Sequence, residues 1–119
     1  MPRAVDGTRR KDRRNKILKQ AKGYWGRRSK AHRTAKDAVA KSLQYAYRDR
    51  RTRKRDFRRL WISRLSAACR AEGITYSRFM EGLKKADVRM DRKTMSNMAI
   101  EDPAAFKQLV ETAKKNANV

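Results

Sequence analysis

The sequence contains very little of what a disulfide framework, a metal clamp or a membrane span requires. Its single cysteine, Cys69, excludes an intramolecular disulfide and any CxxC metal motif. We expect Cys69 to be buried, because it lies among apolar residues, and we expect a reduced, cytoplasmic protein. No apolar run approaches the roughly 20 residues of a membrane-spanning helix, and the first residues lack the apolar core of a secretory signal.

Residues of the catalytic types are also scarce. The only histidine, His32, lies in a basic run, where a phosphate contact or no role at all is commoner than catalysis or metal binding. The sequence has no HExxH, P-loop, GxSxG or paired-carboxylate motif. We therefore predict a protein that is not an enzyme and has no cofactor, no metal and no small-molecule substrate.

Glycine and proline number only five and two, and alternating strand patterns are absent, so we predict an all-α fold. The stretch from Ser29 to Glu72 contains neither residue and is rich in good helix formers. A helix over these 44 residues would be about 65 Å long, so it should project from any globule of this chain. The alternative is a break near its middle.

Shorter helices are expected on both sides of this one. The first should run from Thr8, its N-cap, to a stop at Gly23, after a free tail over residues 1–7, and the segment GYWGRRS should then form a bend. Gly73 is expected to end the long helix. Asp91 and Asp102, the latter followed by Pro103, should be the N-caps of two of three short helices that follow.

Two groups of apolar residues are spaced for helix packing. The expected core of the carboxyl half comprises Leu60, Trp61, Ile62, Leu65, Ala68, Tyr76, Phe79, Met80, Leu83, Met95, Met98, Ala99, Phe106, Leu109, Val110 and Ala113. A narrow stripe of small residues, Ala35, Ala38, Val39, Ser42, Leu43 and Ala46, either packs on the first helix or lets an RNA backbone approach. The predicted organisation is a basic helical extension over residues 1–59 and a small helical bundle over residues 60–119.

Positive charge is what the sequence has in excess. The 34 Lys and Arg residues against 12 Asp and Glu give a net charge of +22, far more than solubility requires. Residues 1–60 carry a net +18 and residues 61–119 only +4, so the charge is concentrated in the amino half. Such an excess is costly to compact unless a polyanion neutralises it, and nucleic acid is the first candidate.

The segment YRDRRTRKRDFRRLW holds the densest charge. Eight of the twelve residues from Arg48 to Arg59 are basic, and at 100° per residue they cover nearly the whole circumference of a helix. A helix on the surface of a globule needs only one solvent-exposed face. Positive charge on every face instead suits a helix surrounded by phosphates, as in folded RNA. Arginine predominates, which favours bidentate phosphate contacts and stacking on bases.

Aromatic residues stand among the basic ones. Tyr24 and Trp25 either stack on unpaired bases or hold the bend together, and Tyr45 and Tyr47 can donate to phosphate or sugar. The predicted RNA-binding residues are Arg9, Arg10, Arg13, Arg14, Lys22, Tyr24, Trp25, Arg27, Arg28, Lys30, His32, Arg33, Tyr47, Arg48, Arg50, Arg51, Arg53, Lys54, Arg55, Arg58 and Arg59.

The segments AKGYWGRRS, QYAYRDRRTRKRDFRRLWISRL and GLKKA resemble the bacterial large-subunit ribosomal protein twenty family. The resemblance runs without gaps from about Ile17 to Lys115. It implies an all-α protein that binds large-subunit ribosomal RNA, is needed early in subunit assembly and is not catalytic. It also implies binding and translational repression of its own messenger RNA, and it assigns RNA contact to Arg27, Arg28, Arg48, Arg50, Arg51, Arg53, Lys54, Arg55, Arg58 and Arg59. Family members tend to have a basic tail up to Gly7, whereas this tail holds Arg3 and Asp6.

Three rival functions make different predictions. A nucleoid or regulatory DNA-binding protein would form a two-fold dimer, yet no heptad seam is present. A membrane-active helix needs an apolar face opposite its charge, and residues 48–59 offer only Phe57. An enzyme acting on RNA lacks catalytic residues. The preferred prediction is an RNA-binding structural component of the large ribosomal subunit, whose globular part contacts neighbouring ribosomal proteins.

Overall fold

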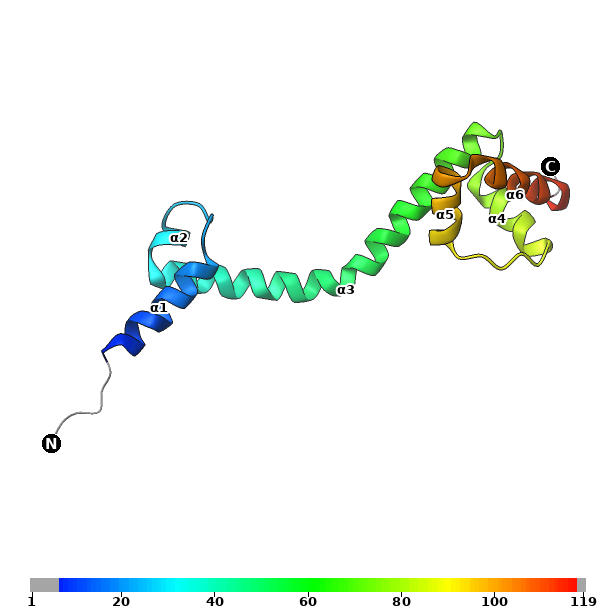
Figure 1. The fold of residues 1–119 in the computed structure, drawn as a ribbon. Coiled ribbons are helices and arrows are strands. Elements are labelled where there is room, and N and C mark those ends of the chain that lie inside the picture. The colour runs from blue at the N-terminus through cyan, green and yellow to red at the C-terminus, as the bar shows by residue number, and fades with distance from the viewer. Residues whose placement is uncertain (1–6, 118–119) are drawn as a thin grey trace. The chain divides into compact units, whose positions relative to one another are not determined.

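Six helices account for all the regular structure in the computed structural model, which describes residues 7–117 (Figure 1). The absence of strands among these residues confirms the all-α prediction. The chain forms two compact units that divide between Arg51 and Thr52. The free tail predicted for residues 1–7, with Arg3 and Asp6, lies outside the described residues except for Gly7.

Helix α1 spans Thr8–Gln20 and begins one residue earlier than predicted. Gly7, not Thr8, occupies the N-cap position, with a right-handed backbone of φ −63° and ψ −18°. Thr8 is therefore the first helical residue, and its prediction as N-cap is wrong. The helix ends three residues before Gly23, whose φ of +87° places it in the turn that follows.

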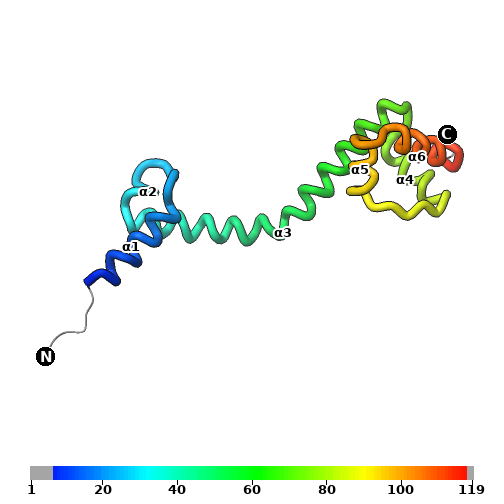
Figure 2. The backbone as a smooth tube through the Cα atoms, in the orientation of Figure 1, coloured from blue at the N-terminus to red at the C-terminus, as the bar shows by residue number. Residues whose placement is uncertain are grey.

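The predicted bend is confirmed and contains a short helix of its own. Gly26 has φ +58°, a left-handed conformation that suits glycine, and the one-turn helix α2, Arg27–Lys30, begins directly after it. The backbone trace in Figure 2 shows the chain looping back through the bend and α2 before the long helix begins. Ala31 is extended, so the long helix cannot start at Ser29 as expected. No glycine or proline marks this break; nothing in the local sequence explains it.

Helix α3 spans His32–Ala71 without interruption for 40 residues, so the alternative of a break near its middle is wrong. Residues 32–51 belong to the first unit and residues 52–71 to the second. In the first unit, Ala35 and Val39 are buried against Ala21, with Ile17, Leu18 and Tyr24 partly covered around them. The first half of the small-residue stripe therefore packs on α1, while Ser42, Leu43 and Ala46 remain exposed.

The end of α3 follows its sequence signal closely. Gly73 has φ +73°, its N–H donates to the carbonyl of Arg70, and the N–H of Ile74 donates to that of Cys69. These two bonds form a Schellman motif, and Ile74 and Cys69 are both buried in the core beside it. The prediction that Gly73 ends the helix is confirmed.

Three short helices complete the second unit. They are α4, Tyr76–Lys85, α5, Arg92–Glu101, and α6, Pro103–Asn116, and α6 packs against both of the others. Both predicted N-caps are confirmed: the Asp91 carboxylate accepts from the Thr94 N–H at 3.0 Å, and the Asp102 carboxylate accepts from the Ala105 N–H at 3.1 Å. Pro103 is the first residue of α6, where a missing N–H costs nothing.

The core of the second unit is close to the prediction. Leu65, Cys69, Phe79, Leu83, Met95, Phe106, Val110 and Ala113 are buried, and most of the remaining predicted members pack around them. Leu60 is 41% exposed, so its assignment to the core is wrong. Trp61 and Ile62 are only half-buried and directly follow the exposed segment of α3 that ends at Leu60.

Candidate nucleic-acid interface

A long part of α3 has no covered face. From Ala40 to Leu60 every residue except Thr52 is exposed, including Leu43, Phe57 and Leu60. Helices in proteins owe most of their stability to packing of an apolar face, and this segment has no such packing against the residues that the structure describes. The like charges at positions i and i+4, such as Arg51 and Arg55, destabilise it further by a few tenths of a kcal/mol per pair. The segment therefore lacks the packing that normally stabilises a helix.

The basic side chains of this segment stand in excess over their acidic partners. Arg48 Nε lies 2.9 Å from the Asp49 carboxylate, and that hydrogen bond raises the pKa of the guanidinium above its ordinary value. Arg59 lies 4.0 Å from Asp56. These are the two acids among the twelve residues from Arg48 to Arg59, against eight basic ones. A net charge of +6 thus remains on three turns of helix.

Tyr45 and Tyr47 each make cation–π contacts with basic side chains of α3. Lys41 Nζ and Arg48 Cζ lie 5.2 and 4.7 Å from the ring centre of Tyr45. Arg50 and Arg51 lie 5.9 and 4.8 Å from the ring centre of Tyr47, whose phenol oxygen also accepts a hydrogen bond from Arg51. Such contacts are worth roughly 0.5–1 kcal/mol at exposed sites. They limit the rotamers of these arginines in the protein alone.

The two aromatic residues of the bend differ in their exposure to solvent. Tyr24 is half-buried and packs on the small core of the first unit, so it stabilises the bend. Trp25 is 92% exposed, between two glycines with left-handed backbones. Tyr24 therefore packs within the fold, whereas the indole of Trp25 is exposed to solvent, and stacking on bases stays a prediction for both residues.

The first unit also brings predicted residues of α1 and α3 together. Arg10, Arg13 and Arg14 line a hollow of about 320 Å³ with His32, Lys36 and Ile17. The predicted residues Arg9, Lys22, Arg27, Arg28, Lys30 and Arg33 are all exposed, and His32 is half-buried. The first unit therefore presents a broad basic surface with no acidic side chain in this hollow.

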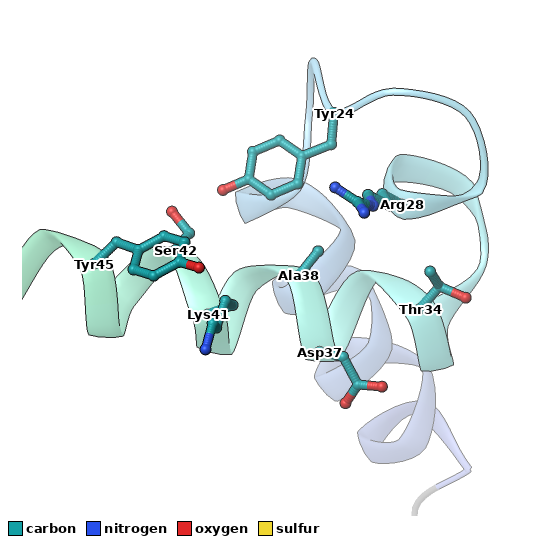
Figure 3. Close-up of a pocket in the computed structure, with 8 residues that line it drawn as sticks. All are labelled: Tyr24, Arg28, Thr34, Asp37, Ala38, Lys41, Ser42 and Tyr45. Atoms are coloured by element: carbon teal, nitrogen blue, oxygen red, sulfur yellow. The ribbon is translucent and has the colours of Figure 1, made fainter.

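A second hollow of about 660 Å³ lies between the bend and α3 (Figure 3). Tyr24 and Arg28 stand along one edge of it, and Asp37 and Lys41 along the opposite edge. Ala38 and Ser42 belong to the helix face between these edges, and Thr34 and Tyr45 mark the two ends. Of these eight residues, only Tyr24 and Arg28 were among the predicted RNA-binding residues.

The second unit adds basic residues that sequence reasoning missed. Arg92 and Lys93, at the start of α5, line a hollow of about 380 Å³ with Lys54, Arg55 and Arg58 of α3. Trp61 and Asp91 complete its walls. The pair Arg92-Lys93 directly after an N-cap was the available signal, but nothing in the sequence brings it beside α3. The basic surface thus continues past residue 59.

Within residues 7–117 no three His, Cys, Asp or Glu side chains are placed to hold a metal ion. Among the same residues, no helix combines the length and the apolar character needed to cross a membrane.

Comparisons with known proteins identify the family. Residues 3–109 match the family model for ribosomal protein L20. The chain is 58% identical over 116 residues to the large ribosomal subunit protein bL20 of Carboxydothermus hydrogenoformans, covering 98% of this chain and 99% of the relative. It is 58% identical over 118 residues to the protein of that name from a Thermoanaerobacter species, covering 99% of each chain. A third such protein, from a Hydrogenobaculum species, is 55% identical over 94% of this chain and 97% of its own. This chain therefore belongs to the ribosomal protein L20 family.

Proposed function

We propose that this protein is a structural component of the large ribosomal subunit and binds its ribosomal RNA directly. The observation that carries the proposal is the segment from Ala40 to Leu60, a helix exposed on every side and ringed with arginine from Arg48 onwards. Family membership supports the choice of RNA, since the relatives are named as large ribosomal subunit proteins. The proposal puts the protein in ribosomes in the cytoplasm.

Folded RNA fits this segment better than duplex DNA or a membrane. A helix in a DNA groove faces bases on one side and leaves its back uncovered, so charge on the back serves no purpose. A membrane-surface helix needs a continuous apolar face, whereas here Phe57 is the single apolar residue between Arg48 and Arg59. Phosphates approaching from several directions, as between packed RNA helices, would neutralise the whole ring.

The predicted RNA-binding residues enter the proposal unchanged. They comprise the arginines and lysines named above between Arg9 and Arg59, together with Tyr24, Trp25, His32 and Tyr47. We likewise propose that the main RNA-binding part ends at the predicted division between residues 59 and 60. Neighbouring ribosomal proteins would contact residues 60–119, which carry little net charge.

Two finer roles belong to the same proposal. By joining RNA segments through its basic helices, the protein would support early assembly of the subunit. It would also bind its own messenger RNA and repress translation. A reporter fused to the messenger leader tests the latter: added protein should lower reporter synthesis, and equal synthesis with and without the protein would refute repression.

Salt dependence tests the RNA contacts directly. Replacing Arg50, Arg51, Arg53 and Arg55 together with Gln should flatten the log–log dependence of ribosomal RNA affinity on salt by about 3, since each phosphate contact contributes roughly 0.7–0.9. The matched control replaces Arg64, Arg70, Lys84 and Lys115, which are exposed residues of the second unit, and loses the same charge. Equal slopes for the two variants would show that net charge, and not this helix, binds RNA.

A further inference from the structure

The hollow between the bend and α3 has the composition of a nucleotide site. Its volume of about 660 Å³ lies within the range of small-molecule pockets. Two phenol rings, Tyr24 and Tyr45, and the methyl group of Ala38 supply its apolar surface. Figure 3 looks onto a face of the Tyr24 ring, with the helix face of α3 beneath it. Flat apolar walls suit a flat ligand.

Polar groups surround this apolar surface. Arg28 stands on the Tyr24 edge, where a guanidinium can hold a phosphate through two hydrogen bonds. Asp37, Thr34 and Ser42 stand elsewhere around the hollow and offer acceptors and donors to the edge of a heterocycle. A planar ring that carries both a phosphate and hydrogen-bonding edges is a nucleotide.

The site is partly organised in advance. Tyr24 packs on the buried trio Ala21, Ala35 and Val39, so its ring is fixed by the fold and a ligand need not order it. Tyr45 is 46% exposed, and Lys41 and Arg48 lie over its ring. These cations sit on long exposed side chains, and a stacked base binds an aromatic ring more strongly than an exposed cation does. A base can therefore take their place while they move to its phosphates.

We propose that this hollow binds one unpaired nucleotide of the RNA, with its base against Tyr24 and Tyr45 and its phosphate on Arg28. The inference rests on the proposed function and deepens it, because it assigns one unstacked base to a particular hollow in addition to the phosphate contacts of the arginines. Sequence-specific RNA recognition typically uses such splayed bases. The site would make the first unit distinguish RNA with a bulge or loop from an uninterrupted helix.

The test compares two RNA hairpins that differ in a single nucleotide. One carries an unpaired 2-aminopurine in a bulge, and in the other that residue is paired. The full-length chain should bind the bulged hairpin about tenfold more tightly and quench its fluorescence by stacking. Ala38→Met, which fills the hollow, and Tyr45→Leu, which removes a wall, should each bring the preference close to onefold.

Matched controls separate the hollow from general effects on the helix. Ala40→Met makes the same change, and Phe57→Leu likewise replaces an aromatic ring with leucine, at exposed positions of α3 outside the hollow; both should keep the tenfold preference. Circular dichroism checks that all four variants retain the helix. A preference that survives both Ala38→Met and Tyr45→Leu would overturn the inference. Salt-dependent binding of wild-type protein without any preference would overturn it while leaving the proposed function intact, and absence of binding to either hairpin would overturn both.

Discussion

Gly82 is the residue whose replacement the structure penalises most clearly. A Cβ atom placed there would lie 2.1 Å from the carbonyl oxygen of Ala113 and 2.8 Å from its Cα. These are backbone atoms of α6, so no side-chain rotation can relieve the overlap. The variant Gly82→Ala must therefore push α4 and α6 apart.

Two opposing effects decide the size of the change. Alanine is better than glycine inside a helix by about 1 kcal/mol. Overpacking a close-packed core typically costs about 1–3 kcal/mol. This case lies at the upper end of that range, because separating α4 from α6 also disturbs the contact between Phe79 and Phe106. The centres of these two rings are 5.6 Å apart. We expect a net loss of about 2 kcal/mol in the stability of the second unit.

Cys69 provides the assay within the full-length chain. It is the only cysteine, it is fully buried, and burial raises the pKa of its thiol to about 11. A thiol reagent reaches it only when the unit opens, so a loss of about 2 kcal/mol should speed labelling roughly 30-fold. The control is Gly7→Ala, where the backbone is right-handed and no atom lies within 4 Å of the new Cβ. Labelling of Gly82→Ala at the wild-type rate would refute the close crossing of α4 and α6.

Three further predictions concern the same unit. Ser96→Ala should raise the melting temperature, because the fully buried Ser96 hydroxyl has no hydrogen-bond partner among the described residues; a lower melting temperature would show that the hydroxyl is bonded. Hydrogen bonds from Thr94 lower the pKa of Asp91, so the stability that its carboxylate contributes is present above its unfolded pKa and lost as pH falls through the folded value. Asp91→Asn should therefore flatten the acid side of the curve of melting temperature against pH, and an unchanged curve would contradict this cause. The raised pKa of Cys69 acts in the opposite direction: the unfolded chain loses the thiol proton first, so stability should fall as pH rises from about 9 towards about 11. Cys69→Ala should remove that alkaline loss, and its persistence would assign the loss to other groups.

Local sequence signals were sufficient where one residue type has one conformational role. Gly73, Asp91, Asp102 and Pro103 mark helix ends because a left-handed residue, a capping carboxylate or a missing N–H is needed there. The helical spacing of Phe79 and Leu83 in α4, and of Met95 and Met98 in α5, likewise indicated the core. Asp87 shows the limit of this reasoning, since it has φ +52° after α4, where glycine would have been the signal.

Features that depend on tertiary contact could not be read in the same way. The break at Ala31 has no marker in the chain, although it precedes the packing of α3 on α1. Leu60 has the right period for the core, but the other helices of the unit do not cover it. The importance of Gly82 arises from Ala113, thirty-one residues later, and its own neighbours give no hint of it.

The candidate interface also has a part that the sequence could predict and a part that it could not. The density of arginine from Arg48 to Arg59 is a property of composition, so the sequence alone was enough to find it. The hollow lined by Tyr24 and Tyr45 and the basic residues Arg92 and Lys93 beside α3 required the fold, because they join segments that are distant in the chain.

Sedimentation tests the central claim most directly. The tagged protein from a gentle lysate is run through a sucrose gradient, and the run is repeated after a high-salt wash. A helix surrounded by RNA on all sides should hold the protein in the large subunit in both runs. Release by high salt would mean a surface-bound factor, and sedimentation with DNA instead of the subunit would contradict the account.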